Sequence, residues 1–275
     1  MNARNLKQSI SRTGRGLHSG LENRLLIEPS NDALTLGVGG KYYALSEFSL
    51  SGGARGSDLI FPENNTRART CEHVLSALCG SGVWRARLTL SGNDDAGLEM
   101  PGLDGCARDL AKEIWEKSEP TDDAPLPLRL SCPVSVGDES RFVVALPSDS
   151  FHVTYVIDYD AAPIGVQILD WSGEDYLANI AGARTFALRR DIEALQAAGL
   201  ALGASLNNAI LVNDDSVETT GGLRFPDEFA RHKTLDLLGD LACVGRPLTA
   251  HVVAVRAGHA LHLQLVERLR SLWRV

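Results

Sequence analysis

Two side chains that commonly bind metals, His232 and Asp236, stand four residues apart late in the chain. If residues 227–241 form a helix, the two lie one turn apart on the same face, and Asp240 extends that face by another turn. Catalytic zinc sites take three such nitrogen and oxygen ligands and leave a fourth position open for water. A hydrogen-bonded surface pair is the commoner explanation of this spacing, so the spacing alone leaves both interpretations open.

The third ligand is expected from a distant segment, and residues 70–78 contain the best candidate. Thr70 is the expected N-cap of a helix there, which places His73 in the first turn beside Glu72. Glu72 could take a proton from a metal-activated water. The helix dipole alone also favours an acidic residue in a first turn, without any catalytic role. The distant His–Asp pair favours the metal site.

The remaining histidines differ in what their surroundings indicate. His259 follows a strand-like run and a glycine-containing turn, where a side chain can face a cleft, although it could also be a helix-start residue without a role. His262 could flank a site. His152 and His251 lie in strand-like runs and are expected to be packed or at the surface. His18 lies in a glycine-rich turn that lacks the spacing of a phosphate loop.

Strand-like runs precede helix-like runs in both halves of the chain, which predicts an α+β fold. Residues 118–128 are rich in proline and acidic side chains and are expected to form a linker. The predicted domains therefore cover residues 1–117 and 129–275. The expected helices cover residues 70–78, 106–117, 191–199, 227–241 and 260–273, with Gly199 as a C-cap.

The composition is that of an ordinary folded protein of 275 residues, with 44% apolar and 23% charged residues. The chain has 27 basic and 35 acidic side chains, a net charge of −8, which argues against a general nucleic-acid-binding protein. No apolar run is long enough for a transmembrane helix, and the N-terminus lacks the apolar stretch of a signal peptide. Five scattered cysteines fit neither a disulfide framework nor a CxxC zinc site. We therefore expect a cytoplasmic protein.

Several longer motifs occur in one order along nearly the whole chain. They include TGRGLHSG at residues 13–20 and RHKTLDLLGD at residues 231–240. The others lie at residues 70–78, 99–107, 183–203, 222–225 and 258–261. Together they resemble the UDP-3-O-acyl-N-acetylglucosamine deacetylase (LpxC) family, the zinc amidases of lipid A biosynthesis in Gram-negative bacteria.

The resemblance implies both a fold and a metal centre. The implied fold has two similar α+β domains, each with a sheet and a pair of helices, and the helices pack between the two sheets. The implied zinc ligands are His73, His232 and Asp236, the trio suggested above by spacing. Glu72 would be the general base that takes a proton from the zinc-bound water.

Further roles are implied for residues around this centre. His259 would be the general acid, and Asp240 would orient it and favour its charged form. Thr185 would stabilise the oxyanion, Lys233 would place positive charge near the substrate, and Phe186 would stack against the nucleotide or sugar. The helix at 191–199 and its flanking strands would form the acyl passage. The other residues implied to bind substrate are Ile192, Ala204, Ser205, Leu211 and Arg256.

The implied substrate is a sugar nucleotide that carries an acyl chain, and the protein is expected to act as a monomer. Because the substrate's pyrophosphate and the whole chain are both negatively charged, a local basic pocket is required. Lys233 and Arg256 are the nearest basic candidates in sequence. Glu139 stands where family members often have lysine, so the turn at residues 137–141 is not expected to contact phosphate.

Two alternatives stay open beside the lipid A deacetylase. Ala204 and Leu211 are larger than the residues often found there in the family, and added methyl groups would narrow the acyl passage. One alternative is therefore a paralogous zinc deacetylase of a different N-acyl amino sugar or glycoside, with a shorter or no acyl chain. The other is a catalytically silent binding protein, against which Glu72 and the metal trio argue.

Overall fold

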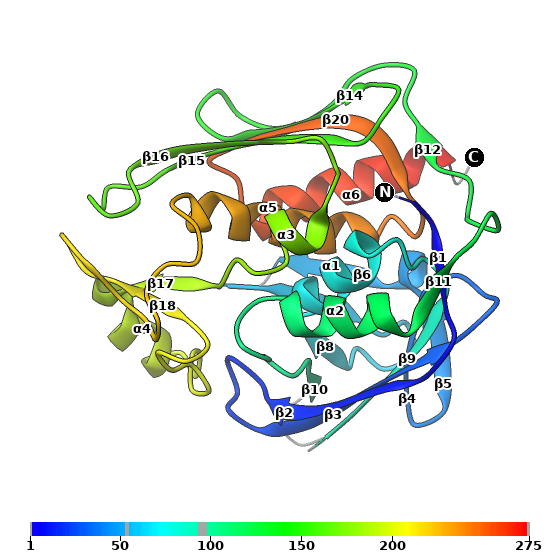
Figure 1. The fold of residues 1–275 in the computed structure, drawn as a ribbon, viewed down its shortest axis with the longest axis horizontal. Helices are drawn as coiled ribbons and strands as arrows, with labels where there is room; N and C mark the ends of the chain where they lie inside the picture. The colour runs from blue at the N-terminus through cyan, green and yellow to red at the C-terminus, as the bar shows by residue number, and fades with distance from the viewer. Residues whose placement is uncertain (1, 53–54, 93–97, 274–275) are drawn as a thin grey trace.

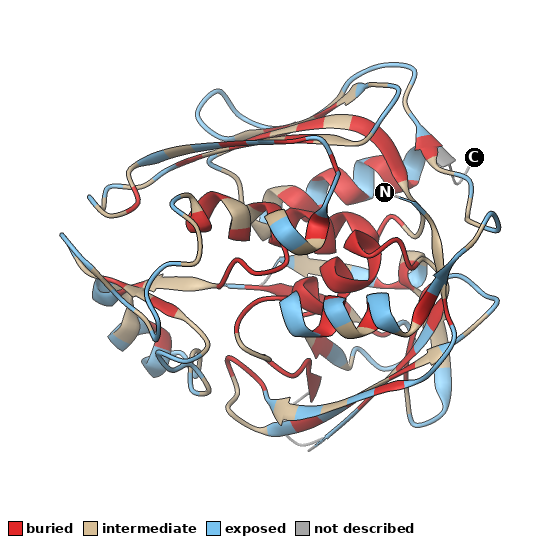
Figure 2. Cartoon of the chain, viewed as in Figure 1, coloured by how far each residue is buried: buried red, intermediate tan, exposed pale blue. Residues whose placement is uncertain are grey.

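Two β-sheets enclose a layer of helices in the computed structural model, which describes residues 2–52, 55–92 and 98–273 (Figure 1). The helices α1 (Glu72–Gly80) and α5 (Glu228–Ala242) between the sheets are buried over almost their whole length, whereas the sheets are buried on their inner faces (Figure 2). The arrangement confirms the predicted α+β fold, in which helices pack between two sheets. Within the described residues, no helix combines the length and apolar character needed to cross a membrane.

Alternating buried and exposed side chains build the first sheet. In β3 (Glu22–Pro29) the side chains of Asn23, Leu25 and Ile27 are buried, whereas their neighbours are exposed or partly exposed. The strand order is β2-β3-β9-β4-β5. The other strands are β2 (Ile10–Arg15), β4 (Thr35–Val38), β5 (Lys41–Ala44) and β9 (Ala86–Gly92).

The second sheet follows the same alternation with strand order β13-β14-β20-β15-β16. In β15 (His152–Asp158) the side chains of Val153, Tyr155 and Ile157 are buried beneath the sheet. β15 pairs in parallel with β20, which pairs antiparallel with β14. The other strands are β13 (Val134–Gly137), β14 (Phe142–Pro147), β16 (Val166–Trp171) and β20 (Leu248–Val255).

The central helices run where the sequence predicts them. They are α1 (Glu72–Gly80), α2 (Arg108–Glu116), α5 (Glu228–Ala242) and α6 (His259–Trp273). Every residue of α1 is buried, and in α5 all residues except Arg231 and Lys233 are buried. α1 and α5 approach closely at Gly239, where a Cβ atom would overlap the backbone carbonyl of Glu72. This glycine therefore lets the first turn of α1 lie against the middle of α5.

The segment between α3 and α5 projects from the layer of helices (Figure 1). It holds a small sheet and α4 (Ile192–Ala197), as expected for the helix predicted at 191–199. Gly199 follows the last turn with φ +72°, a conformation that suits glycine at a helix end. The sheet consists of β17 (Phe186–Leu188), β18 (Ile210–Val212) and β19 (Val217–Glu218), and the 3-10 turn η3 (Arg189–Asp191) leads into α4.

The predicted linker contains two short strands at its ends. β11 (Ser118–Pro120) pairs with β1 (Arg4–Leu6), and β12 (Leu128–Arg129) pairs with β20. A proline is tolerated in β11 because this strand belongs to a two-stranded sheet. The division into domains at this segment stays a prediction. The remaining elements are β6 (Ser49–Gly52), β7 (Ser57–Ile60), β8 (Arg67–Arg69), β10 (Leu98–Glu99), η1 (Leu45–Glu47) and α3 (Tyr176–Asn179).

Candidate active site

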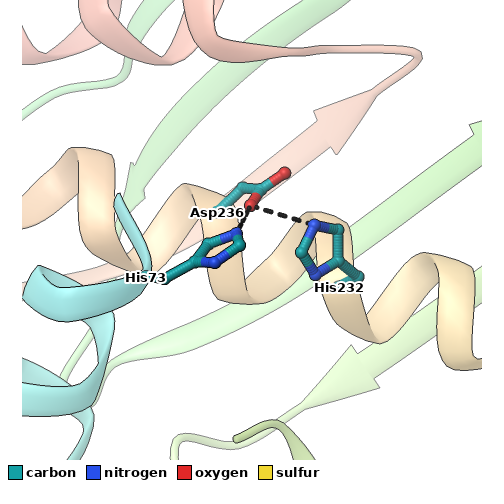
Figure 3. A group of neighbouring side chains, drawn as sticks. All are labelled: His73, His232 and Asp236. Atoms are coloured by element: carbon teal, nitrogen blue, oxygen red, sulfur yellow. Dashed lines mark ion pairs between the residues drawn. The ribbon is translucent and has the colours of Figure 1, made fainter. Parts of the chain in front are cut away.

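The contact between α1 and α5 brings His73, His232 and Asp236 to one point (Figure 3). Asp236 Oδ1 lies 3.4 Å from Nε2 of His232 and 3.6 Å from Nε2 of His73. None of the three residues exposes more than 5% of its surface. The structure thus gathers the three residues whose types and spacing suggested a shared metal ion.

The donor atoms of this trio fit a metal ion. Asp236 Oδ1 is fully buried and has no hydrogen-bond partner, although a buried carboxylate oxygen without a partner is costly. Two imidazole nitrogens face this oxygen, and a set of two nitrogens and one carboxylate oxygen is typical of catalytic zinc. Coordination of a cation would satisfy the oxygen that the protein leaves unpaired.

Backbone contact fixes the orientation of His232. Its Nδ1 lies 3.2 Å from the carbonyl oxygen of Ala183, so an Nδ1–H donates there and Nε2 keeps its lone pair toward Asp236. Burial lowers the pKa of His232 to about 3. The imidazole is therefore neutral at physiological pH, the form that binds a metal.

The entry to α1 differs from the prediction at Thr70. This residue has φ +55°, and the N-cap of α1 is Cys71, which makes no side-chain capping bond. The Thr70 hydroxyl instead donates to Glu99 Oε1 at 3.1 Å. Glu99 also accepts backbone N–H bonds from His18 and Ser19 at 2.8 Å, so it ties the glycine-rich turn to the start of α1. The prediction of Thr70 as N-cap is therefore wrong, because its hydroxyl donates a hydrogen bond to the buried carboxylate of Glu99.

Glu72 lies beside the trio and is almost completely buried. Its Oε2 accepts a hydrogen bond of 3.0 Å from the backbone N–H of Ser57. Burial raises the pKa of Glu72, although the neighbouring His259 and His73 oppose this rise. A carboxylate oxygen of Glu72, one of Asp236 and a nitrogen of His259 lie within 4.8 Å of one another. Glu72 is thus a carboxylate of raised basicity next to the candidate metal position.

His259 starts α6 and points its Nδ1 at Asp240 Oδ2, 2.9 Å away. Burial favours the neutral imidazole, but the charges of Asp240 and Asp236 outweigh burial and raise the pKa of His259 to about 9. Its Nε2 lies 3.6 Å from Asp236 Oδ2. The raised pKa favours a protonated imidazole of His259 beside the trio.

Lys233 lies on the other side of the trio. Its Nζ donates to Asp236 Oδ2 at 2.8 Å and sits 5.7 Å from the centre of the Phe186 ring. Burial lowers the pKa of Lys233, but Asp236 outweighs it and the net shift is upward, so the amine keeps its charge. Thr185 comes just before β17, where its backbone N–H donates to Gly105.

These side chains line one cavity of about 570 Å³. Ten of the residues named from the sequence lie in its wall: Glu72, His73, Thr185, Phe186, Ala204, His232, Lys233, Asp236, Arg256 and His259. Asp240 stands behind His259. Ile192, Ser205 and Leu211 are not in the wall formed by the described residues, and the hydroxyl of Ser205 donates to Asn208 Oδ1. Their role in substrate binding stays a prediction.

Sequence reasoning did not assign several residues of the site. Arg141, Arg55 and His18 line the cavity, and Ser57 donates its hydroxyl to Asp240. His18 lies in the motif TGRGLHSG, which was its only signal. Arg141 belongs to the turn at residues 137–141, from which no phosphate contact was expected, yet its side chain lines the cavity.

Comparison with known proteins decides the family. The family described as "LpxC: UDP-3-O-acyl N-acetylglycosamine deacetylase" matches residues 3–271. The chain belongs to this family. Proteins named "UDP-3-O-acyl-N-acetylglucosamine deacetylase" are similar along almost the whole chain. One from Anaeromyxobacter sp. (strain Fw109-5) is 36% identical, covering 98% of this chain and 88% of that protein. One from Trichormus variabilis is 34% identical, covering 99% of each.

A third relative with the same name, from Neisseria meningitidis serogroup C, is 33% identical and covers 96% of this chain and 88% of its own length. Family membership therefore spans the described fold from β1 to α6. LpxC membership also accounts for the order of the motifs at residues 13–20, 70–78 and 231–240, which all reach the cavity or its supporting carboxylates.

Proposed function

We propose that this protein removes the acetyl group from UDP-3-O-acyl-N-acetylglucosamine, the committed step of lipid A biosynthesis. The observation that carries the proposal is the buried Oδ1 of Asp236, which has no hydrogen bond and faces two imidazoles in the cavity wall. Glu72 and His259 line the same cavity and are the proposed base and acid. Family membership supplies the substrate class.

Zinc held by His73, His232 and Asp236 would lower the pKa of a coordinated water from about 15.7 to about 7 and polarise the amide carbonyl. Glu72 would accept the proton that a water molecule loses when its oxygen adds to the amide carbonyl carbon. The raised pKa of Glu72 suits this task, because a more basic carboxylate takes the proton more readily.

The second half of the reaction breaks the carbon–nitrogen bond. His259 donates its proton to the leaving nitrogen, and acetate and the free 2-amino sugar are released. Asp240 keeps the imidazole of His259 oriented and charged until that transfer. Thr185 and Lys233 lie in the cavity wall, where a hydroxyl and an ammonium stabilise negative charge on the carbonyl oxygen.

Four basic side chains line the same cavity, and each also lies 2.7–3.9 Å from a carboxylate. They are Arg55, Arg141, Lys233 and Arg256. Guanidinium groups bind phosphate oxygens in a bidentate manner, so Arg141 and Arg256 suit the pyrophosphate of a sugar nucleotide. The net charge of −8 therefore does not argue against an anionic substrate.

Apolar side chains line the part of the wall near the projecting segment. They are Leu17, Leu195, Ala201, Ala204 and Ala209. We propose that the acyl chain lies against them, which favours an acylated substrate over a paralogue without an acyl chain. We further propose that the enzyme depends on zinc and acts as a monomer. A cytoplasmic location is proposed because a UDP-sugar is a cytoplasmic substrate.

Acetate release by zinc-loaded protein tests the proposal. We expect rapid release from UDP-3-O-acyl-N-acetylglucosamine and at least about tenfold slower release from UDP-N-acetylglucosamine, which lacks the acyl chain that the apolar wall would bind. Equal rates on both would favour the paralogue. Absence of release from the acylated substrate would refute the proposed function.

A further inference from the structure

A second histidine contacts the carboxylate behind His259. His262 lies one turn further along α6, outside the motif at residues 258–261, and is completely buried. Its Nδ1 is 2.8 Å from Asp240 Oδ2, the same oxygen that His259 Nδ1 meets at 2.9 Å. Asp240 is therefore shared between two imidazoles, only one of which lines the cavity among the described residues.

Asp240 and Tyr155 contact the two ring nitrogens of His262 and together define its tautomer. The buried Tyr155 hydroxyl, on β15, lies 2.9 Å from Nε2 of His262. An ionised carboxylate only accepts hydrogen bonds, so the Nδ1 that faces Asp240 carries a proton. With the tyrosine O–H donating to Nε2, the imidazole of His262 is neutral and holds a single tautomer. Burial lowers the pKa of His262, in agreement with this assignment.

Ser57 completes the set of donors around Asp240. Its hydroxyl donates to Asp240 Oδ1, and the same oxygen atom of Ser57 lies 3.1 Å from Nδ1 of His259. Both oxygens of the Asp240 carboxylate therefore have partners: Ser57 of β7 contacts Oδ1, and two histidines of α6 contact Oδ2. Tyr155 of β15 holds His262 in turn. A carboxylate held from these directions cannot turn about its side-chain bonds, so the direction of its bond to His259 is fixed.

We infer that His262, aligned by Tyr155, is a positioning residue that fixes the Asp240 carboxylate and thereby the imidazole of His259. The inference rests on the proposed function, because His259 is the proton donor of that reaction. His262 does not reach the cavity wall, so its loss should slow proton transfer without weakening substrate binding. Its partner Tyr155 acts one step further from the reaction and should have a smaller effect.

Steady-state acetate release by zinc-loaded variants tests the assignment. We expect His262→Leu to lower kcat about 10- to 100-fold with little change in KM and with zinc content retained. His262→Asn should regain most of the lost kcat, since its amide nitrogen can donate from near the position of Nδ1. Tyr155→Phe should lower kcat less, and it serves as the test if the leucine variant fails to fold. Unchanged kcat in both His262→Leu and Tyr155→Phe, or no recovery in His262→Asn, would overturn the inference.

A double-mutant cycle with Asp240→Asn separates positioning from general loss of structure. If His262 acts through Asp240, adding His262→Leu to Asp240→Asn should cost little further kcat. Losses that multiply would contradict the inference.

A proton NMR measurement gives a reading that does not depend on turnover. In zinc-loaded wild-type protein, the Nδ1–H resonances of His259 and His262 should both lie downfield, and Tyr155→Phe should shift both. A shift confined to His262 would overturn the inference, whether or not the protein releases acetate. Absence of acetate release would by itself refute only the proposed function.

Discussion

Asp236 and Asp240 lie one turn apart on α5 and are both almost completely buried, yet their oxygens meet different partners. Asp240 has hydrogen-bond donors on both oxygens, from Ser57, His259 and His262. Asp236 has Lys233 on Oδ2, but its Oδ1 has no hydrogen bond. A buried carboxylate needs compensation, and here one is compensated by the protein while the other is left open for a cation.

The difference shows that helical spacing alone does not assign a role to an acidic residue. Both aspartates extend the face that starts at His232, and both face imidazoles. Only the completeness of the hydrogen bonding separates a candidate metal ligand from a residue that orients a proton donor. Each prediction below alters one side of this comparison.

Metal removal should have the largest effect, because it empties the site that Asp236 shares with His73 and His232 and leaves Asp240 unchanged. Dialysis against a chelator should abolish acetate release and lower the melting temperature, since metal that binds only the folded state stabilises it. One equivalent of zinc should restore both, as followed by elemental analysis and thermal unfolding. Full activity in protein shown to be free of metal would contradict the assignment.

Glu72→Gln should come next in size. The amide cannot accept a proton from water, so we expect kcat to fall about 10²- to 10⁴-fold. Zinc content should be unchanged, because Glu72 is not one of the three proposed ligands. Kinetics and elemental analysis on the same preparation check both points, and wild-type turnover in this variant would refute the role of general base.

Asp240→Asn should lower kcat while zinc stays bound. The proposed acid must be protonated, so activity is present below the pKa of His259 and is lost as pH rises through it. Removing the negative charge of Asp240 removes the main cause of the raised pKa, so the alkaline limb of the pH–rate profile should move to lower pH. An alkaline limb at the wild-type position would mean that Asp240 does not set the charge of His259.

Arg141→Gln should have the smallest effect, because Arg141 touches neither aspartate. Loss of one charged contact with the pyrophosphate should raise KM about tenfold and leave kcat nearly unchanged. Glu139→Gln, in the same turn, is the matched control and should leave KM near its wild-type value. An equal change in both variants would show that Arg141 does not contact the substrate.

Local pattern predicted the helices, and it pointed to the three residues that the structure brings together as candidate metal ligands. The spacing of His232 and Asp236 survives in α5 because an α-helix places residues i and i+4 on one face. His73 was named because it lies beside Glu72 at a helix start, and α1 does begin at Glu72. The packing of α1 against α5 joins two segments that are far apart in sequence. Local pattern does not predict this contact, which was expected only through the family resemblance.

Contacts between distant strands and helices could not be predicted from local pattern. Ser57 and Asp240 are 183 residues apart, and His262 meets Tyr155 across 107 residues. Thr70 looked like an N-cap, but its hydroxyl bonds to Glu99, which the sequence gives no reason to place there. Such pairings depend on which face of a strand meets which helix, and periodicity does not encode this.

Zinc content of Asp236→Asn and Asp240→Asn, purified side by side and dialysed against limiting zinc, tests the division of roles most directly. The amide is isosteric with the carboxylate in both variants, so only the charge and ligand strength change. We predict that Asp240→Asn keeps one zinc ion per chain and that Asp236→Asn loses most of it. Equal zinc content in the two variants would contradict the account.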